Sequence, residues 1–359
     1  MFTAIRTITC HKKSFSLLNG QVFRNFGISS VQLSSLQQQF EEAKAKLNSL
    51  AEDPGNETKL KLYGLFKQST EGSVTSKRPG LTDFVGRAKW DAWNSNGSMS
   101  QEEAQKKYIE IINSLVKTEE SVEAARQESG QKYKYLLVDC DGGLTKITLN
   151  RPKKFNALLY ETYVEWVDAL TVAENDPKTV ITAVTGAGPF FCAGNDFSVF
   201  TGINPAEIPS ASEKRGEDLK RFVGTFIEFK KPLVAVVNGP AVGIGVTLLP
   251  LFDGVYASDK ATFTTPFSAT GQAPEGCSSL LFPRLMGFGK ASQMLLFNKK
   301  LTAEEACAAG IVSEVFPDDR LDAEIWPRLK EYSKLPLKSL VYSKALIRDQ
   351  EKALLHKAS

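Results

Sequence analysis

The pattern of apolar residues changes once along this 359-residue chain, and that change limits the fold more than any other feature. Residues 36–117 carry apolar side chains at every third or fourth position, as amphipathic helices do. From residue 135 onward, strands rich in β-branched residues alternate with helical stretches. Since that alternation is typical of a mostly parallel sheet covered by helices, we predict an all-α unit followed by an α/β unit spanning 135–359. The polar segment 118–134 is the expected linker.

Local signals predict where individual helices and strands lie. A break at Asp53-Pro54-Gly55 separates the first two helices, and Ser100 with Glu103 forms the capping-box pattern that opens the fourth. The helices of the first unit are expected near residues 36–47, 57–68, 81–89 and 100–115. In the second unit we expect strands at 144–149, 180–185 and 233–237, and helices at 161–175 and 216–229.

Histidine and cysteine usage restricts the chemistry that this chain can perform. His11 and His356 are the only histidines, and both lie near the ends of the sequence. The cysteines lack CxxC spacing; they are Cys10, Cys140, Cys192, Cys277 and Cys307. Serine-histidine triads and histidine-ligated metals are therefore disfavoured. Carboxylates, lysines and backbone amides remain as catalytic groups, and we predict no metal and no cofactor.

Charge and hydropathy argue against two classes of partner. The formal net charge of +3 is too small to indicate a nucleic-acid partner. No apolar run approaches the roughly 20 residues that a membrane-spanning helix requires. We therefore expect neither nucleic acid nor a membrane span.

The first 35 residues have the composition of a mitochondrial transit peptide. Arg6, Lys12, Lys13 and Arg24 all precede the first acidic residue, Glu41, and the segment is rich in Ser, Thr and Phe. A disordered basic tail without a targeting function is the alternative. The sequence thus predicts mitochondrial import.

Three motifs in the helical unit carry a resemblance to a known family. They are Tyr63-Gly64-Leu65-Phe66-Lys67-Gln68-Ser69-Thr70-Glu71-Gly72, then Arg78-Pro79-Gly80, then Lys89-Trp90-Asp91-Ala92-Trp93-Asn94. Together they resemble the acyl-CoA-binding protein family over residues 36–117, which implies a four-helix bundle that binds acyl-CoA. The resemblance places the ligand at Tyr63, Lys67, Lys89 and Tyr108, with Gly64, Leu65 and Phe66 in the same motif.

The residue types in that set suit a CoA ligand. Lysines meet its phosphates, an aromatic face stacks on adenine, and apolar side chains line a trough for the acyl chain. Two positions depart from the family pattern: Phe66 replaces a usual tyrosine, and Asn48 replaces a frequent lysine. These departures predict weakened affinity.

Some of these residues have a structural alternative. Trp90, Trp93 and Tyr108 are equally suited to the core of a helical bundle, and Lys67 and Lys89 to its solvated surface. We favour a core position for Trp93 and ligand contact for the two lysines.

Motifs in the second unit resemble the crotonase, or enoyl-CoA hydratase/isomerase, superfamily. They are Asn150-Arg151-Pro152-Lys153-Lys154-Phe155-Asn156-Ala157, Phe191-Cys192-Ala193-Gly194-Asn195-Asp196-Phe197, Asn238-Gly239-Pro240-Ala241-Val242-Gly243-Ile244-Gly245 and the later 301–306 and 309–312 segments. The resemblance implies an α/β crotonase fold, an enoyl-CoA substrate and a homotrimer. It places the two backbone N–H donors of an oxyanion hole at Ala193 and Ile244, in a substrate pocket with Gly194, Asn195, Asp196, Phe197 and Gly243.

The identity of the base distinguishes members of this superfamily. Hydratases carry two glutamates, whose positions are occupied here by Thr247 and Phe267, so water addition is not expected. The segment around Glu275 resembles the peroxisomal-type delta3,delta2-enoyl-CoA isomerases, in which the corresponding glutamate shuttles a proton. A hydrophobic surround would raise the pKa of Glu275 toward neutrality. The alternative for Glu275 is a carboxylate that interacts with a helix dipole.

Four other polar residues of these motifs receive weaker assignments. Lys153 and Lys154 are suited either to CoA phosphates or to solvent, and both possibilities stay open. Cys192 and Cys277 are not expected to act as nucleophiles, because no histidine is near them in the sequence. Asp196 is expected to stabilise a turn rather than to act as a base.

The end of the chain motivates a second function. The resemblance to the isomerases weakens after about Lys338, where such proteins continue with helices that close the site and support trimer contacts, so we expect a shortened C-terminus. An acyl-CoA carrier or sensor with a catalytically silent crotonase domain is therefore the alternative to isomerisation of 3-enoyl-CoA to trans-2-enoyl-CoA in β-oxidation. The peroxisome matrix is the alternative compartment, because the isomerases that this segment resembles are found there.

Overall fold

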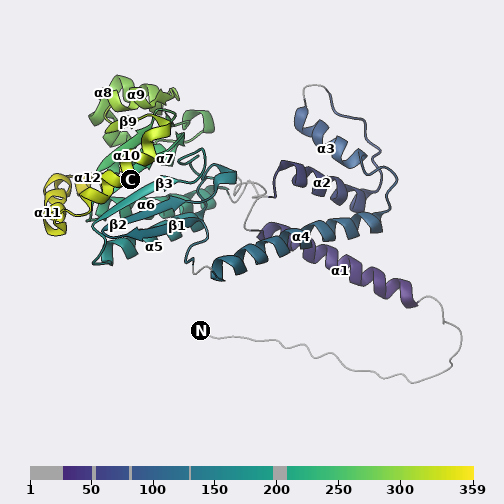
Figure 1. Ribbon diagram of the computed structural model, residues 1–359. Helices are drawn as coiled ribbons and strands as arrows, with labels where there is room; N and C mark the ends of the chain where they lie inside the picture. The colour runs from purple at the N-terminus through teal and green to yellow at the C-terminus, as the bar shows by residue number, and fades with distance from the viewer. Residues whose placement is uncertain (1–26, 51–53, 81–82, 129–130, 197–207) are drawn as a thin grey trace, which may run out of the picture. The chain divides into compact units, whose positions relative to one another are not determined.

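The computed structural model describes residues 27–50, 54–80, 83–128, 131–196 and 208–359. The chain divides into two compact units, Met1–Ala125 and Arg126–Ser359, called the helical unit and the α/β unit below (Figure 1). Most of the predicted transit peptide, residues 1–26, lies outside the described residues. None of the described helices has the length and hydropathy needed to cross a membrane.

Four helices make up the helical unit. They are α1 (Gly27–Ser49), α2 (Asn56–Glu71), α3 (Phe84–Asn94) and α4 (Gln101–Glu128). Phe40, Leu62, Leu65, Tyr108 and Ile112 meet in their core. The Ser100 hydroxyl accepts a hydrogen bond from the Glu103 N–H at 3.2 Å, which confirms the predicted start of the fourth helix.

The helices are longer than the sequence pattern predicts. Helix α1 begins before residue 36, and α4 continues through Glu128 into the segment expected to be a linker. The sequence of that segment explains the difference, because Glu, Ala, Arg and Gln have high helix propensity and no glycine or proline interrupts them before Gly130. Few large apolar residues occur in this segment, and apolar periodicity is the signal from which a helix is predicted, so the sequence pattern did not predict the extension.

A six-stranded sheet forms the centre of the α/β unit, in the order β1-β2-β3-β4-β6-β9. Its strands are β1 (Leu136–Asp141), β2 (Leu144–Leu149), β3 (Ile181–Gly186), β4 (Leu233–Val237), β6 (Gly254–Ser258) and β9 (Glu314–Phe316). Only the β1–β2 pair of this sheet is antiparallel, so the prediction of a mostly parallel sheet is confirmed. A small second sheet contains β5 (Ala241–Val242), β7 (Thr262–Thr264) and β8 (Leu301–Thr302).

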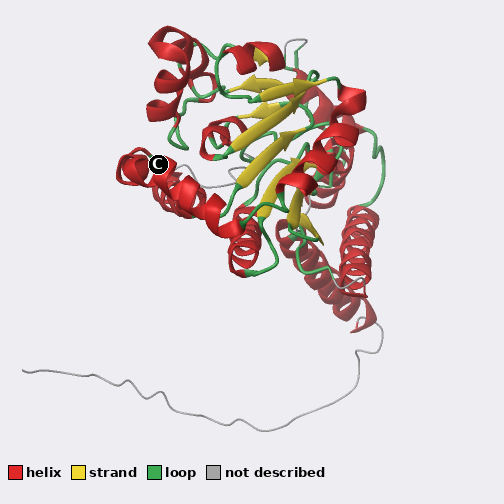
Figure 2. Ribbon diagram, turned by 60° about the vertical axis from the view of Figure 1, so that its left-hand side comes forward, coloured by secondary structure: helices red, strands yellow, loops and turns green. Residues whose placement is uncertain are grey.

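Helices cover both faces of the central sheet (Figure 2). Helices α5 (Tyr160–Asn175) and α6 (Ile208–Glu228) belong to the larger core cluster, and α10 (Asp318–Tyr332) to the smaller one. Strand β4 divides its side chains between the two: Leu233, Ala235 and Val237 enter the first cluster, and Val234 and Val236 the second. Burial on both faces explains its continuous apolar run.

The remaining described elements are the long helix α8, short helices, single 3-10 turns and the C-terminal helices. They are α7 (Ile244–Thr247), α8 (Ser278–Leu295), α9 (Ala303–Ala308), α11 (Leu337–Arg348), α12 (Lys352–Ala358), η1 (Pro152–Lys154), η4 (Leu249–Leu251), η5 (Ser268–Thr270) and η6 (Asp349–Glu351).

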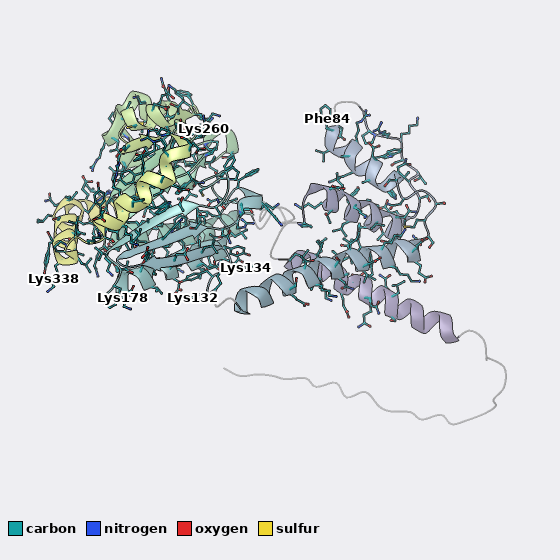
Figure 3. All side chains as sticks on the ribbon, viewed as in Figure 1. Phe84, Lys132, Lys134, Lys178, Lys260 and Lys338 are labelled. Carbon is teal, nitrogen blue, oxygen red and sulfur yellow. The ribbon has the colours of Figure 1, made fainter. Side chains whose placement is uncertain are left out.

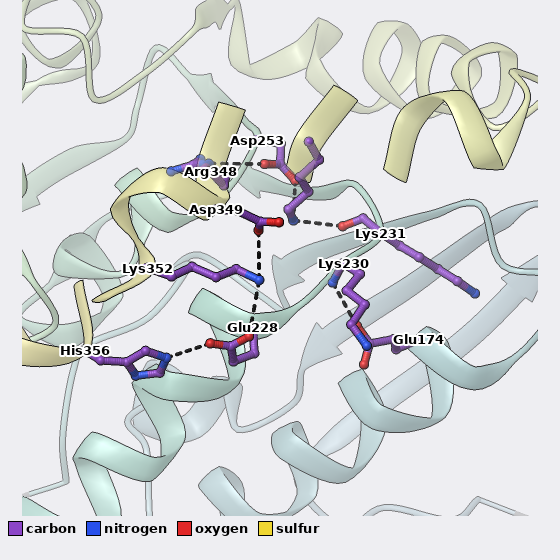
Figure 4. Close-up of polar contacts among 10 residues, drawn as sticks. Glu174, Glu228, Lys230, Lys231, Asp253, Arg348, Asp349, Lys352 and His356 are labelled. Carbon is purple, nitrogen blue, oxygen red and sulfur yellow. Dashed lines mark hydrogen bonds and ion pairs between the residues drawn. The ribbon is translucent and has the colours of Figure 1, made fainter. Parts of the chain in front are cut away.

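Helix α11 begins at Leu337 and contains Lys338, and α11 and α12 both pack on the α/β unit. Arg348 donates hydrogen bonds to the carbonyls of Pro250 and Phe252, and the Nζ of Lys344 lies 2.6 Å from Asp253. Farther along, Lys352 and His356 both contact Glu228 of α6 (Figure 4). Helical structure therefore continues past the point where the sequence resemblance was expected to weaken.

Candidate active site

Two glycine turns meet at the ends of neighbouring strands. The Val242 N–H donates to the Cys192 carbonyl at 2.8 Å, which joins the turn after β3 to the turn after β4. Gly194 has φ +83, and a Cβ there would lie 2.9 Å from the Val242 carbonyl oxygen. Gly243 has φ +54, a conformation that L side chains rarely adopt. The motif glycines thus allow the two turns to approach.

The two predicted amide donors differ in their surroundings. Ile244 is the first residue of α7, so its N–H has no acceptor within the helix. The Ala193 N–H instead donates to the Phe155 carbonyl at 2.9 Å. Phe155 has φ 52, and its exposed ring lies 4.6 Å from that of Phe190. One predicted donor is therefore already hydrogen-bonded within the protein.

Glu275 lies in the loop between η5 and α8, and a residue of α7 contacts its side chain. The Thr247 hydroxyl donates to Glu275 Oε1 at 2.8 Å, and Oε2 is buried without a hydrogen-bond partner. Burial raises the pKa of Glu275 from its usual 4.5 to about 7, although the Thr247 hydrogen bond lowers it. A carboxyl group with a pKa near neutrality can both accept and return a proton.

The residues after Glu275 fix the course of its loop. Gly276 has φ +62, and a Cβ at this position would lie 2.5 Å from Thr247 Oγ1. Only glycine therefore lets the loop approach α7 this closely. Cys277 has φ 63, and its Sγ donates to the Leu355 carbonyl at 3.3 Å, so α12 contacts the same loop.

The other pocket residues of the 191–197 motif have structural partners. Arg151 and Asp196 form a largely buried ion pair at 3.1 Å, in keeping with a turn-stabilising role for Asp196. The Tyr163 hydroxyl hydrogen-bonds to Asn195 Oδ1. Phe197 lies outside the described residues.

Burial determines the protonation state of the two cysteines in this site. Burial raises the pKa of Cys192 to about 12 and that of Cys277 to about 11, so both remain thiols at neutral pH. Within the described part of the chain, no three His, Cys, Asp or Glu side chains form a group that could hold a metal ion. Phe267, at the second hydratase position, is buried in the larger core cluster.

Within the helical unit, some of the predicted acyl-CoA residues are accessible and others lie in the core. Lys89 Nζ lies 5.3 Å from the centre of the Tyr63 ring, and Lys67 Nζ lies 5.4 Å from that of Trp93. Lys67 also pairs with Glu71 on the same helix. These pairs place cations beside aromatic rings, the combination that a nucleotide ligand requires.

Three residues of the predicted acyl-CoA set pack inside the bundle instead. Tyr108 is 3% exposed, with its ring 5.0 Å from that of Phe40, and Leu65 is buried beside it. A Cβ at Gly64 would lie 2.2 Å from the Ala92 carbonyl oxygen, so this glycine allows α2 and α3 to approach. Phe66 is half-buried and stacks near Phe40.

The tryptophans and the arginine of the family motif stabilise the bundle. Trp93 is buried, as predicted, and its indole N–H donates to the Gly72 carbonyl at 2.9 Å. Arg78 Nε donates to Asp91 at 2.7 Å, which attaches the segment after α2 to α3.

Sequence reasoning assigned Thr247 no part in the site beyond its inability to act as a base. Its contact with Glu275 joins residues that are 28 positions apart, so no local pattern indicates it. One feature of the sequence could have indicated that Thr247 lies in the site: it occupies a position where hydratases carry a catalytic glutamate.

Two family models match the chain. The enoyl-CoA hydratase/isomerase model covers residues 139–358, and the acyl-CoA-binding protein model covers residues 37–112. The first match extends beyond Lys338 almost to the end of the sequence.

Curated proteins and a solved structure agree with the first of these matches. Enoyl-CoA delta isomerase 2 of Rattus norvegicus is 52% identical over 330 residues, which are 90% of this chain and 83% of the rat protein. The peroxisomal enoyl-CoA delta isomerase 3 of Mus musculus is 48% identical over 78% of this chain and 88% of its own length. An enoyl-CoA hydratase/isomerase structure from Pseudoalteromonas atlantica superposes with a TM-score of 0.56 at 36% identity, over 63% of this chain and 87% of that chain. The chain therefore belongs to the enoyl-CoA hydratase/isomerase family and carries an acyl-CoA-binding protein domain ahead of its crotonase-fold unit.

Proposed function

We propose that this chain is a delta3,delta2-enoyl-CoA isomerase that converts 3-enoyl-CoA to trans-2-enoyl-CoA during β-oxidation of unsaturated fatty acids. The observation that carries the proposal is the buried carboxyl group of Glu275, whose pKa of about 7 suits proton transfer in both directions. The relatives named as enoyl-CoA delta isomerases support the same activity.

A single carboxylate accounts for the complete reaction. Ionised Glu275 removes a proton from C2 of the 3-enoyl thioester, and the electron pair of that bond forms a dienolate with its charge on the thioester oxygen. Glu275 then returns the proton to C4, and the double bond lies between C2 and C3. Atoms and electrons balance without an oxidant, a metal or a cofactor.

Backbone amides are proposed to stabilise the dienolate. The Ile244 N–H is free of intrahelical bonding, and Ala193 offers a second N–H when the substrate oxygen replaces the Phe155 carbonyl. Gly194, Gly243, Asn195 and Asp196 then position the turns around the substrate. Donors aimed at a developing oxyanion typically lower the barrier by about 3–4 kcal/mol each.

Hydration is disfavoured at this site. A hydratase requires two carboxylates to hold and activate water, and the corresponding positions are Thr247 and Phe267. Both side chains are buried and neither can transfer a proton at neutral pH.

The helical unit is proposed to bind acyl-CoA through Tyr63, Lys67 and Lys89. The lysines supply positive charge for the phosphates, and the partly exposed Tyr63 ring beside Lys89 supplies a stacking surface. Phe84 lies at the start of α3 (Figure 3). Its side chain is 78% exposed and is a candidate contact for the acyl chain. Leu65 and Tyr108 contribute indirectly, as members of the buried core of the helical unit.

The decisive experiment compares the wild type with Glu275→Gln on 3-enoyl-CoA and on 2-enoyl-CoA in water. The amide keeps the shape of the side chain but cannot shuttle a proton, so isomerisation should fall by about 10² to 10⁴ while acyl-CoA binding persists. Full activity of Glu275→Gln would exclude the mechanism. An inactive wild type that still binds acyl-CoA would favour the carrier or sensor alternative, and hydration of 2-enoyl-CoA would favour a hydratase.

A homotrimer through the α/β unit forms part of the proposal. Leu285, Phe288, Leu296 and Phe297 expose apolar surface on and just after α8, and Phe288 is 80% exposed. Such a surface is typical of a protein interface. Light scattering should report a trimer, and Phe288→Glu together with Phe297→Glu should yield a monomer that remains folded.

Import into mitochondria is proposed from the basic composition of residues 1–35, with the peroxisome matrix as the alternative because the mouse relative is named peroxisomal. A fluorescent fusion of the full chain, with and without residues 1–35, distinguishes the two compartments.

A further inference from the structure

The two carboxylate oxygens of Glu275 have different surroundings. Oε1 accepts the Thr247 hydroxyl proton at 2.8 Å, whereas Oε2 is buried and has no protein partner. Thr247 is itself fully buried, so bulk solvent does not compete for this hydrogen bond. The asymmetry is a property of the chain before any substrate binds.

Short helix α7 holds the threonine in place. The Thr247 N–H donates to the Gly243 carbonyl at 3.0 Å, and the absence of a side chain at Gly276 leaves room for the Thr247 hydroxyl. The first residue of the same helix is Ile244. The threonine hydroxyl and the Ile244 amide therefore belong to one rigid turn.

We propose that Thr247 is a positioning residue that reserves Oε2 of Glu275 as the single oxygen that carries the proton from C2 to C4. The inference rests on the proposed isomerase function, which it deepens. Thr247 stands at a position where hydratases carry a glutamate. The threonine cannot activate water there, and in this proposal its hydroxyl orients Glu275, the base that remains.

The hydrogen bond is compatible with both halves of the reaction. When the C2–H bond breaks, the proton joins Oε2, and Oε1 becomes the carbonyl oxygen of the acid while it continues to accept from Thr247. When the new C4–H bond forms, the proton leaves Oε2 and the carboxylate is restored. The Thr247 hydrogen bond is never broken, so Glu275 does not have to rotate between the two transfers.

The hydrogen bond also adjusts the basicity of Glu275. Because Thr247 donates to the charged form, it lowers the pKa of Glu275 against the larger effect of burial, which raises it. Loss of the hydroxyl should move that pKa upward, and less of the base is then ionised at neutral pH.

The test uses three variants of the full chain. Thr247→Val removes the hydroxyl and keeps the shape, and Thr247→Ser keeps the hydroxyl. Thr182→Val is the matched control, because Thr182 is a fully buried threonine of β3 whose hydroxyl has no hydrogen-bond partner. If Thr247→Val does not fold, Thr247→Ala replaces it.

Two measurements are made on each variant. One is the pH profile of kcat/KM with 3-enoyl-CoA, and the other is a ¹³C NMR titration of the glutamate carboxyl groups, in which Glu275→Gln identifies the Glu275 signal. Thr247→Val should raise the pKa in both by about one unit, as expected for loss of a hydrogen bond to a charged group. Thr247→Ser and Thr182→Val should keep the wild-type value.

The fraction of isotope label transferred from C2 to C4 is a second measurement, and it would not change if Thr247 had only a structural role. Thr247→Val should return a smaller fraction of C2 label to C4 than Thr247→Ser, because its acid can rotate and exchange. If Thr247→Val folds and the pKa of its Glu275 equals the wild-type value, the inference is wrong, even if the wild type is an active isomerase. An inactive wild type would overturn the proposed function, while the NMR titration would still decide whether Thr247 controls the pKa of Glu275.

Discussion

Burial of one carboxyl group has two consequences at the scale of the residue. It gives Glu275 a pKa of about 7, and it makes the ionised form unfavourable in the folded chain. The property that suits Glu275 to proton transfer therefore also reduces the stability of the fold at neutral pH. Active sites commonly contain residues of this kind.

The stability cost leads to a pH-dependent prediction. The folded pKa lies above the unfolded value of 4.5, so the stabilising contribution is present below about pH 4.5 and is lost as pH rises through about 7. Above pH 8, Glu275→Gln should therefore increase the free energy of unfolding by about 3 kcal/mol, since each pKa unit corresponds to about 1.4 kcal/mol. Denaturant titrations at pH 5 and pH 8 measure the difference, which should shrink at the lower pH. Equal stabilities at pH 8 would contradict the assigned burial.

At the scale of the element, the C-terminal helix α12 is expected to support the loop that carries Glu275. Leu355 is buried, and its carbonyl accepts from Cys277, two residues after Glu275. Leu355→Ala should lower the free energy of unfolding by about 2–5 kcal/mol and reduce isomerase activity. Leu354→Ala is the matched control, because the neighbouring leucine is largely exposed. Comparable losses in both variants would contradict a specific contact between α12 and the loop.

The face formed by α2 and α3 carries the acyl-CoA prediction. Lys67→Ala and Lys89→Ala should each weaken acyl-CoA binding about tenfold or more, because each removes a cation that meets phosphate. Lys106→Ala is the control, since Lys106 also forms an exposed Lys–Glu pair four residues apart but lies on α4. Calorimetric titration measures the affinities. Unchanged binding in both variants would show that the phosphates bind elsewhere.

At the scale of the whole molecule, the two units should unfold separately. Each has its own core, and the chain divides near Ala125. Differential scanning calorimetry is expected to show two transitions. A long-chain acyl-CoA at 100 times its dissociation constant should stabilise the helical unit by about 2.7 kcal/mol. The double variant Lys67→Ala, Lys89→Ala should lose this shift and keep both transitions, and a single transition would contradict independent units.

Most of the architecture was predictable from sequence because it is encoded locally. Strands β2 and β4 lie at the predicted residues, and α5 begins at Tyr160, next to the expected start. Their apolar periodicity directly reports which face is buried. The polar extension of α4 through Glu128 was not predicted, because periodicity detects burial and this segment has no apolar stripe.

By itself, the sequence determined the two-unit organisation and the glycine turns, because these depend on residue type and spacing along the chain. The resemblance of its motifs to the crotonase superfamily indicated the family and Glu275 as the candidate base. Only the tertiary structure decided which side chains and backbone groups contact one another. Thr247 contacts Glu275, and the Phe155 carbonyl reaches the Ala193 N–H, while Tyr108 enters the core instead of remaining accessible. The physical reason is that hydrogen bonding and burial depend on the packing of segments distant in sequence, and no local pattern of residues specifies that packing.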